Sequence, residues 1–139
     1  MISFKFRLQK VLEFRASCET TAKNLYLAKR SEVLATEAEI INIRKRRLDT
    51  LSEPRSSIDA FRILEGELLR LDDEEREQNV VLSVLNDEAE TLRIAWTRHK
   101  QDLETIEKLR EKAHDEWTKE VNRREQAELD EWSVLRRVA

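Results

Sequence analysis

The chain has 139 residues, of which 40% are charged, and it contains one glycine, one proline and one cysteine. Globular domains carry about 25% charged residues, and loops need glycine and proline, so the composition excludes a domain with a thick core and indicates long, solvated helices. The net charge of −3 combines a basic part, residues 1–51 with eleven Lys and Arg against six Asp and Glu, and an acidic remainder with fifteen against twenty-three. These opposite charges favour pairing between the two parts, and the balance does not indicate a nucleic-acid-binding protein.

A single cysteine, Cys18, excludes an internal disulfide and agrees with a reducing compartment. No apolar run approaches the roughly 20 residues of a membrane span, and the first residues lack the apolar segment of a signal peptide. We therefore expect a cytoplasmic protein with no direct membrane insertion.

The first predicted helix covers about residues 3–51, with Ser3 as its cap. Its apolar residues are expected to form a seam against a partner helix, the later ones at seven-residue spacing. The early seam residues are Phe4, Leu8, Val11, Leu12 and Leu25, and the later ones are Leu27, Leu34, Ile41 and Leu48.

Residues 52–57 are the predicted turn, because Pro54 disfavours helix at the residue before it and cannot donate a backbone hydrogen bond. Ser56 with Asp59 three residues later is typical of a helix cap, so the second helix is expected over about residues 57–138. A turn this short returns the chain antiparallel to itself.

The second helix carries the strongest pattern in the chain. Alternating steps of three and four residues from Phe61 to Trp117 meet seventeen positions, of which thirteen are apolar. A repeat of 3.5 residues held this long predicts a left-handed coiled coil. The predicted fold is therefore all-α, with two long helices in an antiparallel coiled-coil hairpin that forms a single domain over residues 1–139.

The second helix is predicted to overhang the first. If the chain folds about Pro54, Phe4 lies opposite residue 104, and residues from about Ile106 to the end have no partner within the chain. This overhang is amphipathic and therefore predicts a partner, either another protein or a second copy of the chain. Its apolar residues are Trp117, Val121, Leu129, Trp132, Val134, Leu135 and Val138.

No pattern predicts catalysis, a metal or a cofactor. Glu111 and His114 have the spacing of one ligand pair of a di-iron bundle, but such sites need two pairs and further carboxylates. His99 falls on the seam, where a polar residue more often sets the register. The basic run from Arg44 to Arg47 points all round a helix and is expected to be a solvated, ion-paired surface.

Three runs resemble the FliJ family of flagellar export proteins, and the resemblance covers the whole chain. The first is the opening Phe6-Arg-Leu-Gln-Lys-Val-Leu-Glu-Phe-Arg15. The others are Glu107-Lys-Leu-Arg-Glu-Lys112 and Arg124-Glu-Gln-Ala-Glu-Leu-Asp-Glu131.

The resemblance implies a coiled coil similar to the central stalk of rotary ATPases, in the cytoplasm and peripherally associated with the inner membrane. The implied partners are the hexameric flagellar export ATPase, whose assembly and activity it promotes, the cytoplasmic domain of the export gate protein FlhA, and export chaperones. The implied ATPase contacts are Phe4, Leu8, Leu12, Trp117, Val121, Trp132 and Leu135. The implied gate contacts are Ile41, Arg44, Leu48, Phe61 and Leu68. The alternative is a generic coiled-coil scaffold or adapter that self-associates through its C-terminal overhang.

Overall fold

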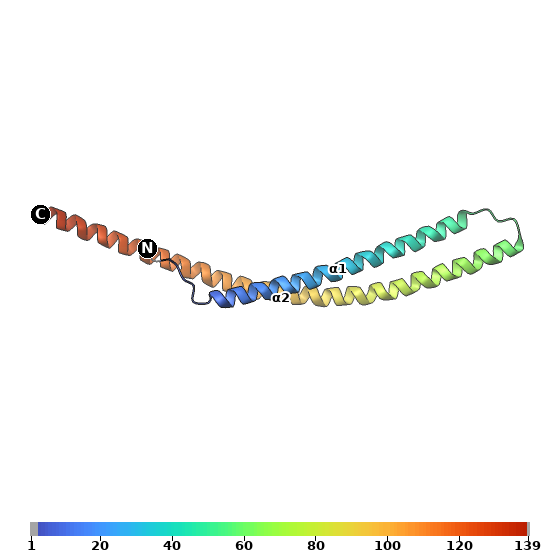
Figure 1. Cartoon of the computed structure of the whole chain (residues 1–139), viewed down its shortest axis with the longest axis horizontal. Coiled ribbons are helices and arrows are strands. Elements are labelled where there is room, and N and C mark those ends of the chain that lie inside the picture. The colour runs from blue at the N-terminus through green and yellow to red at the C-terminus, as the bar shows by residue number, and fades with distance from the viewer. Residues whose placement is uncertain (1–2, 139) are drawn as a thin grey trace. The chain divides into compact units, whose positions relative to one another are not determined.

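A computed structural model describes residues 3–138, and within that range the regular structure consists of two α-helices (Figure 1). Helix α1 spans Gln9–Ser52 and helix α2 spans Ile58–Val138, with 44 and 81 residues. The prediction of two long helices packed against each other is confirmed. The chain divides into two compact units, Thr21–Trp96 and the part formed by the segment up to Thr20 with the segment from Thr97 onward. The single-domain organisation stays a prediction, and each unit is described by itself.

The first unit is a helical hairpin whose turn lies at residues 53–57, around Pro54 as expected. The cap of α2 is Ser57 and not Ser56, since the Ser57 hydroxyl oxygen accepts a hydrogen bond from the backbone N–H of Ala60 at 3.1 Å. A serine at this position satisfies one of the free N–H groups at the start of a helix. Two adjacent serines precede α2, and the structure shows that the second one is the cap.

The buried seam of this unit is formed on α1 by a row in which steps of three and four residues alternate. Val33 and Ile43 are 0% and 1% exposed. The predicted residues Leu27, Leu34, Ile41 and Leu48 do not belong to this row, because their side chains are 49% to 65% exposed. Each of them lies one residue after a seam position, so the seven-residue spacing was correct and the face was wrong. The row consists of Tyr26, Lys29, Val33, Thr36, Ile40, Ile43 and Arg47.

The seam predicted on α2 is confirmed from Leu64 to Trp117, where every position except Arg110 is buried or half-buried. Phe61 was expected in this seam and is 56% exposed. Helix α2 begins beyond the point where α1 ends, so the first turns of α2 have no helix opposite them (Figure 1).

In the second unit, residues 3–8 are not helical, so the prediction that a helix starts at Ser3 is wrong. Their burial alternates, with Phe4, Phe6 and Leu8 half-buried and Lys5 and Arg7 exposed. Alternation with a period of two is the pattern of an extended chain and not of a helix. The segment turns into α1 through a hydrogen bond from the Gln9 N–H to the Phe6 carbonyl oxygen at 3.2 Å.

The register of the two helices gives a shorter overhang than predicted. Phe4 packs on His114 and Trp117, and not opposite residue 104. In this unit Arg15 pairs with Asp102, whereas a fold about Pro54 would place it opposite residue 93, so α1 faces a part of α2 about nine residues further along than predicted. Ile106 is buried at 7% exposure, and the exposed part of α2 begins after Val121, at residues 122–138.

Two adjacent isoleucines test the assignment of the two faces of α1. Ile40 is 5% exposed and Ile41 is 65% exposed. We expect Ile40→Ala to lower the free energy of unfolding by about 2 kcal/mol, since it leaves a cavity in the seam, and Ile41→Ala to change it by less than about 0.5 kcal/mol. Urea unfolding followed by circular dichroism measures both, and equal losses would place Ile41 in the seam.

Candidate interaction surfaces

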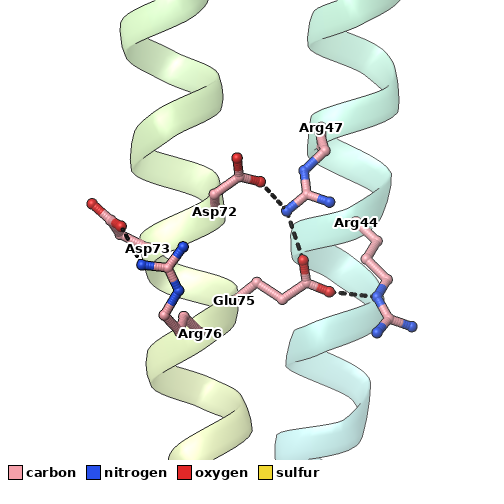
Figure 2. A network of polar contacts seen from close by, with 6 residues as sticks. All are labelled: Arg44, Arg47, Asp72, Asp73, Glu75 and Arg76. Atoms are coloured by element: carbon pink, nitrogen blue, oxygen red, sulfur yellow. Dashed lines mark hydrogen bonds and ion pairs between the residues drawn. The ribbon is translucent and has the colours of Figure 1, made fainter.

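A network of four charged side chains crosses the hairpin unit (Figure 2). Arg47 bonds to Asp72 at 2.5 Å and to Glu75 at 2.6 Å, and Nε of Arg44 donates to Glu75 at 2.5 Å. Glu75 occupies a seam position, and its side chain is only 14% exposed. Hydrogen bonds from Arg44 and then from Arg47 hold the pKa of Glu75 below its ordinary value. A charged residue in a seam is tolerated only in one register, so this network fixes the alignment of α1 against α2.

The predicted ion pairing of the basic run is borne out by the contacts of three of its members. Arg44 and Arg47 take part in the network just described, and Arg46 contacts Glu39 at 3.3 Å and Glu74 at 3.6 Å. The run supplies the cations that α1 presents to the acidic α2.

A second polar contact and a ring stack lie further along the same unit. Lys29 bonds to Glu88 at 2.8 Å and to Glu32 at 2.9 Å, and these hydrogen bonds raise its pKa. The rings of Tyr26 and Trp96 stack with centroids 5.6 Å apart. Both residues of the stack are large, and they close the seam beside the small residue Ala22, which is 8% exposed.

The N-terminal segment is held on α2 by an aromatic cluster in the second unit. The ring of Phe4 meets His114 edge-on at 5.0 Å and lies 5.8 Å from Trp117. The guanidinium group of Arg110 lies 5.6 Å from the centre of the Phe4 ring, which is a favourable cation–π position. This contact explains why an arginine occupies a position of the predicted repeat.

Beyond this cluster, α2 presents an exposed apolar surface that we call the distal surface, formed by residues 129–138. Trp132 is 60% exposed and Leu135 is 66% exposed, and Arg136 lies 5.0 Å from the ring centre of Trp132. Solvated ion pairs between Glu120 and both Arg123 and Arg124 precede it. The apolar residues of the distal surface are Leu129, Trp132, Val134, Leu135 and Val138.

A family model described as the flagellar FliJ protein matches residues 4–137. The chain belongs to the flagellar FliJ protein family. Searches of curated proteins and of solved structures gave no match. The family places the chain among coiled-coil proteins related to flagellar export, as a structural component and not as a member of a known enzyme family.

Two properties of the described residues bear on this FliJ-family chain. Over residues 3–138, no helical stretch combines the length and the apolar content that crossing a membrane requires. In the same range, no three histidine, cysteine or acidic side chains gather as ligands for a metal ion.

The residues that family resemblance assigns to the ATPase fall into two groups. Phe4 and Trp117 pack on each other, and Leu8, Leu12 and Val121 are half-buried. Trp132 and Leu135 are exposed on the distal surface. The structure therefore brings Phe4 and Trp117 into contact and leaves Trp132 and Leu135 largely exposed.

The residues assigned to the export gate also differ in how exposed they are. Ile41, Leu48 and Phe61 are 65%, 64% and 56% exposed. Arg44 is exposed but bonded to Glu75, and Leu68 is half-buried in the hairpin. Ile41 and Leu48 share one face of α1, since they lie seven residues apart.

Sequence reasoning missed the network around Glu75. Part of the signal was present, because Glu75 interrupts an apolar repeat. Arg44 lies 10 residues before Pro54 and Glu75 lies 21 residues after it, so folding about Pro54 does not bring the two together.

The network predicts an acid-sensitive hairpin. The pKa of Glu75 is lower in the folded protein than the ordinary value of 4.5, so its stabilising contribution is complete above about pH 4.5 and is lost as the pH falls through the lowered pKa. We expect the melting temperature to fall between pH 6 and pH 3, and Glu75→Gln to reduce the part of this fall that belongs to the network. Thermal melting by circular dichroism across this range measures it. An unchanged pH profile in the variant would show that Glu75 does not carry the effect.

Proposed function

We propose that this chain is a stalk-like component of the flagellar type III protein export apparatus in the cytoplasm, peripherally associated with the inner membrane. It binds the hexameric export ATPase, promotes the assembly and activity of the ring, and links the ring to the export gate protein FlhA and to export chaperones. In this role it supports flagellum assembly, motility and chemotaxis. The observation that carries the proposal is the apolar distal surface at the end of a FliJ-family helix, where α2 continues without a helix beside it.

The distal surface is the part of the chain suited to enter a ring of ATPase subunits. A single helix is about 10 Å wide with its side chains, narrower than a coiled coil. Its exposed tryptophan and leucine side chains are of the kind that dominate protein interfaces. In this proposal Trp132 and Leu135 contact the ATPase directly. Phe4, Leu8, Leu12, Trp117 and Val121 act by holding the N-terminal segment on α2 next to this surface.

The turn-side half supplies the gate contact in this proposal. Ile41, Leu48 and Phe61 are exposed there, and an exposed apolar side chain gains free energy when a partner covers it. Arg44 and Leu68 lie at the edges of this contact and are partly engaged by the hairpin itself.

Self-association is the second candidate, because the exposed distal surface would also be covered by another copy of the chain. Sedimentation equilibrium separates the two candidates. A monomer at micromolar concentration supports the export proposal, and a dimer that Trp132→Ala disrupts supports the scaffold.

The ATPase contact is tested by measuring ATP hydrolysis of the cognate export ATPase at a concentration where the ring is partly assembled. We expect stimulation that saturates near one chain per hexamer. Trp132→Ala with Leu135→Ala should raise the concentration for half-maximal stimulation by about tenfold or more, as loss of an aromatic anchor does. The matched control is Val80→Ala with Val84→Ala, which changes two exposed residues of the hairpin unit. No stimulation by the unaltered, folded chain would contradict the proposal.

The gate contact is tested with the double variant Ile41→Ala and Phe61→Ala. We expect its affinity for the cytoplasmic domain of FlhA to fall by about tenfold, while ATPase stimulation stays at the level of the unaltered chain. Isothermal titration calorimetry measures the first quantity, with the Val80→Ala and Val84→Ala variant as control. Loss of ATPase stimulation in the double variant would contradict the assignment of the two contacts to different parts of the chain.

A further inference from the structure

Helix α1 carries a second row with the spacing of a coiled-coil seam, on a face that α2 does not cover. Starting at Leu27 and ending at Leu48, steps of four and three residues alternate without interruption. All seven positions are exposed, and the four large apolar side chains are 49% to 65% exposed. We call this the outer row. It consists of Leu27, Ser31, Leu34, Ala38, Ile41, Lys45 and Leu48.

The geometry of the hairpin keeps the outer row straight. A row spaced 3.5 residues apart drifts around a straight helix, but it runs parallel to the axis of a helix that already supercoils around a partner. The buried seam supplies that supercoil, and the outer row follows the same seven-residue repeat on another face of α1. The outer row is therefore a continuous stripe of about 30 Å.

The composition of the outer row suits a closely packed helix. Its large residues alternate with Ser31 and Ala38, and small side chains allow a neighbouring helix to approach between bulkier ones. A solvated face of a two-helix coil ordinarily carries polar residues at these positions. The outer row thus has the properties of a seam and lacks a partner among the described residues.

The residues on the two sides of the outer row indicate the charge of that partner. In heptad geometry one flank carries Lys23, Arg30, Glu37 and Arg44, and Lys45 lies in the row itself. Arg44 is already bonded to Glu75, so Lys23, Arg30 and Lys45, against Glu37, make this side basic. The opposite flank carries Ala28, Ala35, Asn42 and Asp49 and is nearly neutral. A helix with carboxylates along one edge complements this arrangement.

A second copy of the chain does not complement the outer row in full overlap. Antiparallel pairing of two fully overlapping rows would place Glu37 beside Glu37 and Arg30 of each copy beside Arg44 of the other. A shift by one heptad would bring Arg30 beside Glu37 but would leave part of each row uncovered, and parallel pairing would bury Lys45 against Lys45. Like charges across a seam disfavour pairing, so we take the occupant to be a helix of a different protein.

We propose that the outer row binds an amphipathic α-helix of another protein, which has apolar residues at alternating three- and four-residue spacing and a row of carboxylates on one edge. The bound helix packs on the side of α1 that faces away from α2, so that α1 lies between the two helices. The proposal rests on the proposed function in one respect, since Ile41 and Leu48 belong both to the outer row and to the gate contact. It extends that contact toward Leu27 and defines the bound segment as a helix.

The test uses a synthetic helix as probe. A fluorescein-labelled peptide of four heptads, with leucine at both seam positions and glutamate on both edges, is titrated with the full chain and followed by fluorescence anisotropy. We expect saturable binding that is at least tenfold tighter than binding of the same peptide with lysine on its edges. The charge reversal Arg30→Glu should reduce the ratio between the affinities for the glutamate peptide and the lysine peptide.

Paired substitutions locate the binding face. Leu34→Asp with Ile41→Asp should reduce binding of the glutamate peptide by at least tenfold, and Ile63→Asp with Leu69→Asp, at exposed positions of α2, should leave it unchanged. Circular dichroism establishes that both variants keep their helices. Absence of binding, or binding unaffected by the first pair, overturns the proposal, and so does a dimer of the chain that the first pair abolishes.

The probe separates this proposal from the proposed function, because the assay contains no export component. Peptide binding without ATPase stimulation would support the outer row as a binding site and contradict the stalk function. ATPase stimulation without peptide binding would support the stalk function and contradict the outer row as a binding site.

Discussion

The structure depends on a thin seam in which each helix buries one stripe of side chains. The only side chains of α1 at or below 8% exposure are Ala22, Val33, Ile40 and Ile43 among the described residues. So narrow a core gives little preference among registers, since sliding one helix by a turn replaces one apolar contact by another. The network of Arg44, Arg47, Asp72 and Glu75 removes this ambiguity, because only one alignment places the cations beside the anions. Apolar burial holds the helices together, and charge decides how they are aligned.

Most of the fold could be predicted because it follows from periodicity. The repeat on α2 is long enough that its interruptions at Glu75, Gln78, His99 and Arg110 do not hide it, and the turn follows from Pro54. The seam of α1 could not be predicted in the same way, because two rows one residue apart both satisfy the spacing. Leu34 and Ile41 are as apolar as Val33 and Ile40, and only packing against α2 distinguishes them. The network around Glu75 and the stack of Tyr26 on Trp96 both depend on a register that the sequence does not state.

The contact residues expected from family resemblance form two groups: those that pack against other parts of the same chain and those that are exposed. A side chain such as Trp117 is engaged by Phe4, so its substitution would disturb the protein before it disturbed a partner. Trp132, whose ring contacts Arg136 of the same helix, and Ile41 are 60% and 65% exposed, so substituting them would disturb folding less. Helix α1 likewise carries apolar residues on two sides: one side forms the hairpin, and the other is the side for which we propose a partner.

The extended segment before α1 has a mechanical consequence. A helical N-terminus would be joined to the rest of α1 by its backbone hydrogen bonds, and lifting it from α2 would require unwinding. Residues 3–8 lie outside α1 and bury alternate side chains, among them Phe4 against His114 and Trp117. Lifting this segment from α2 would therefore expose Trp117 without unwinding α1.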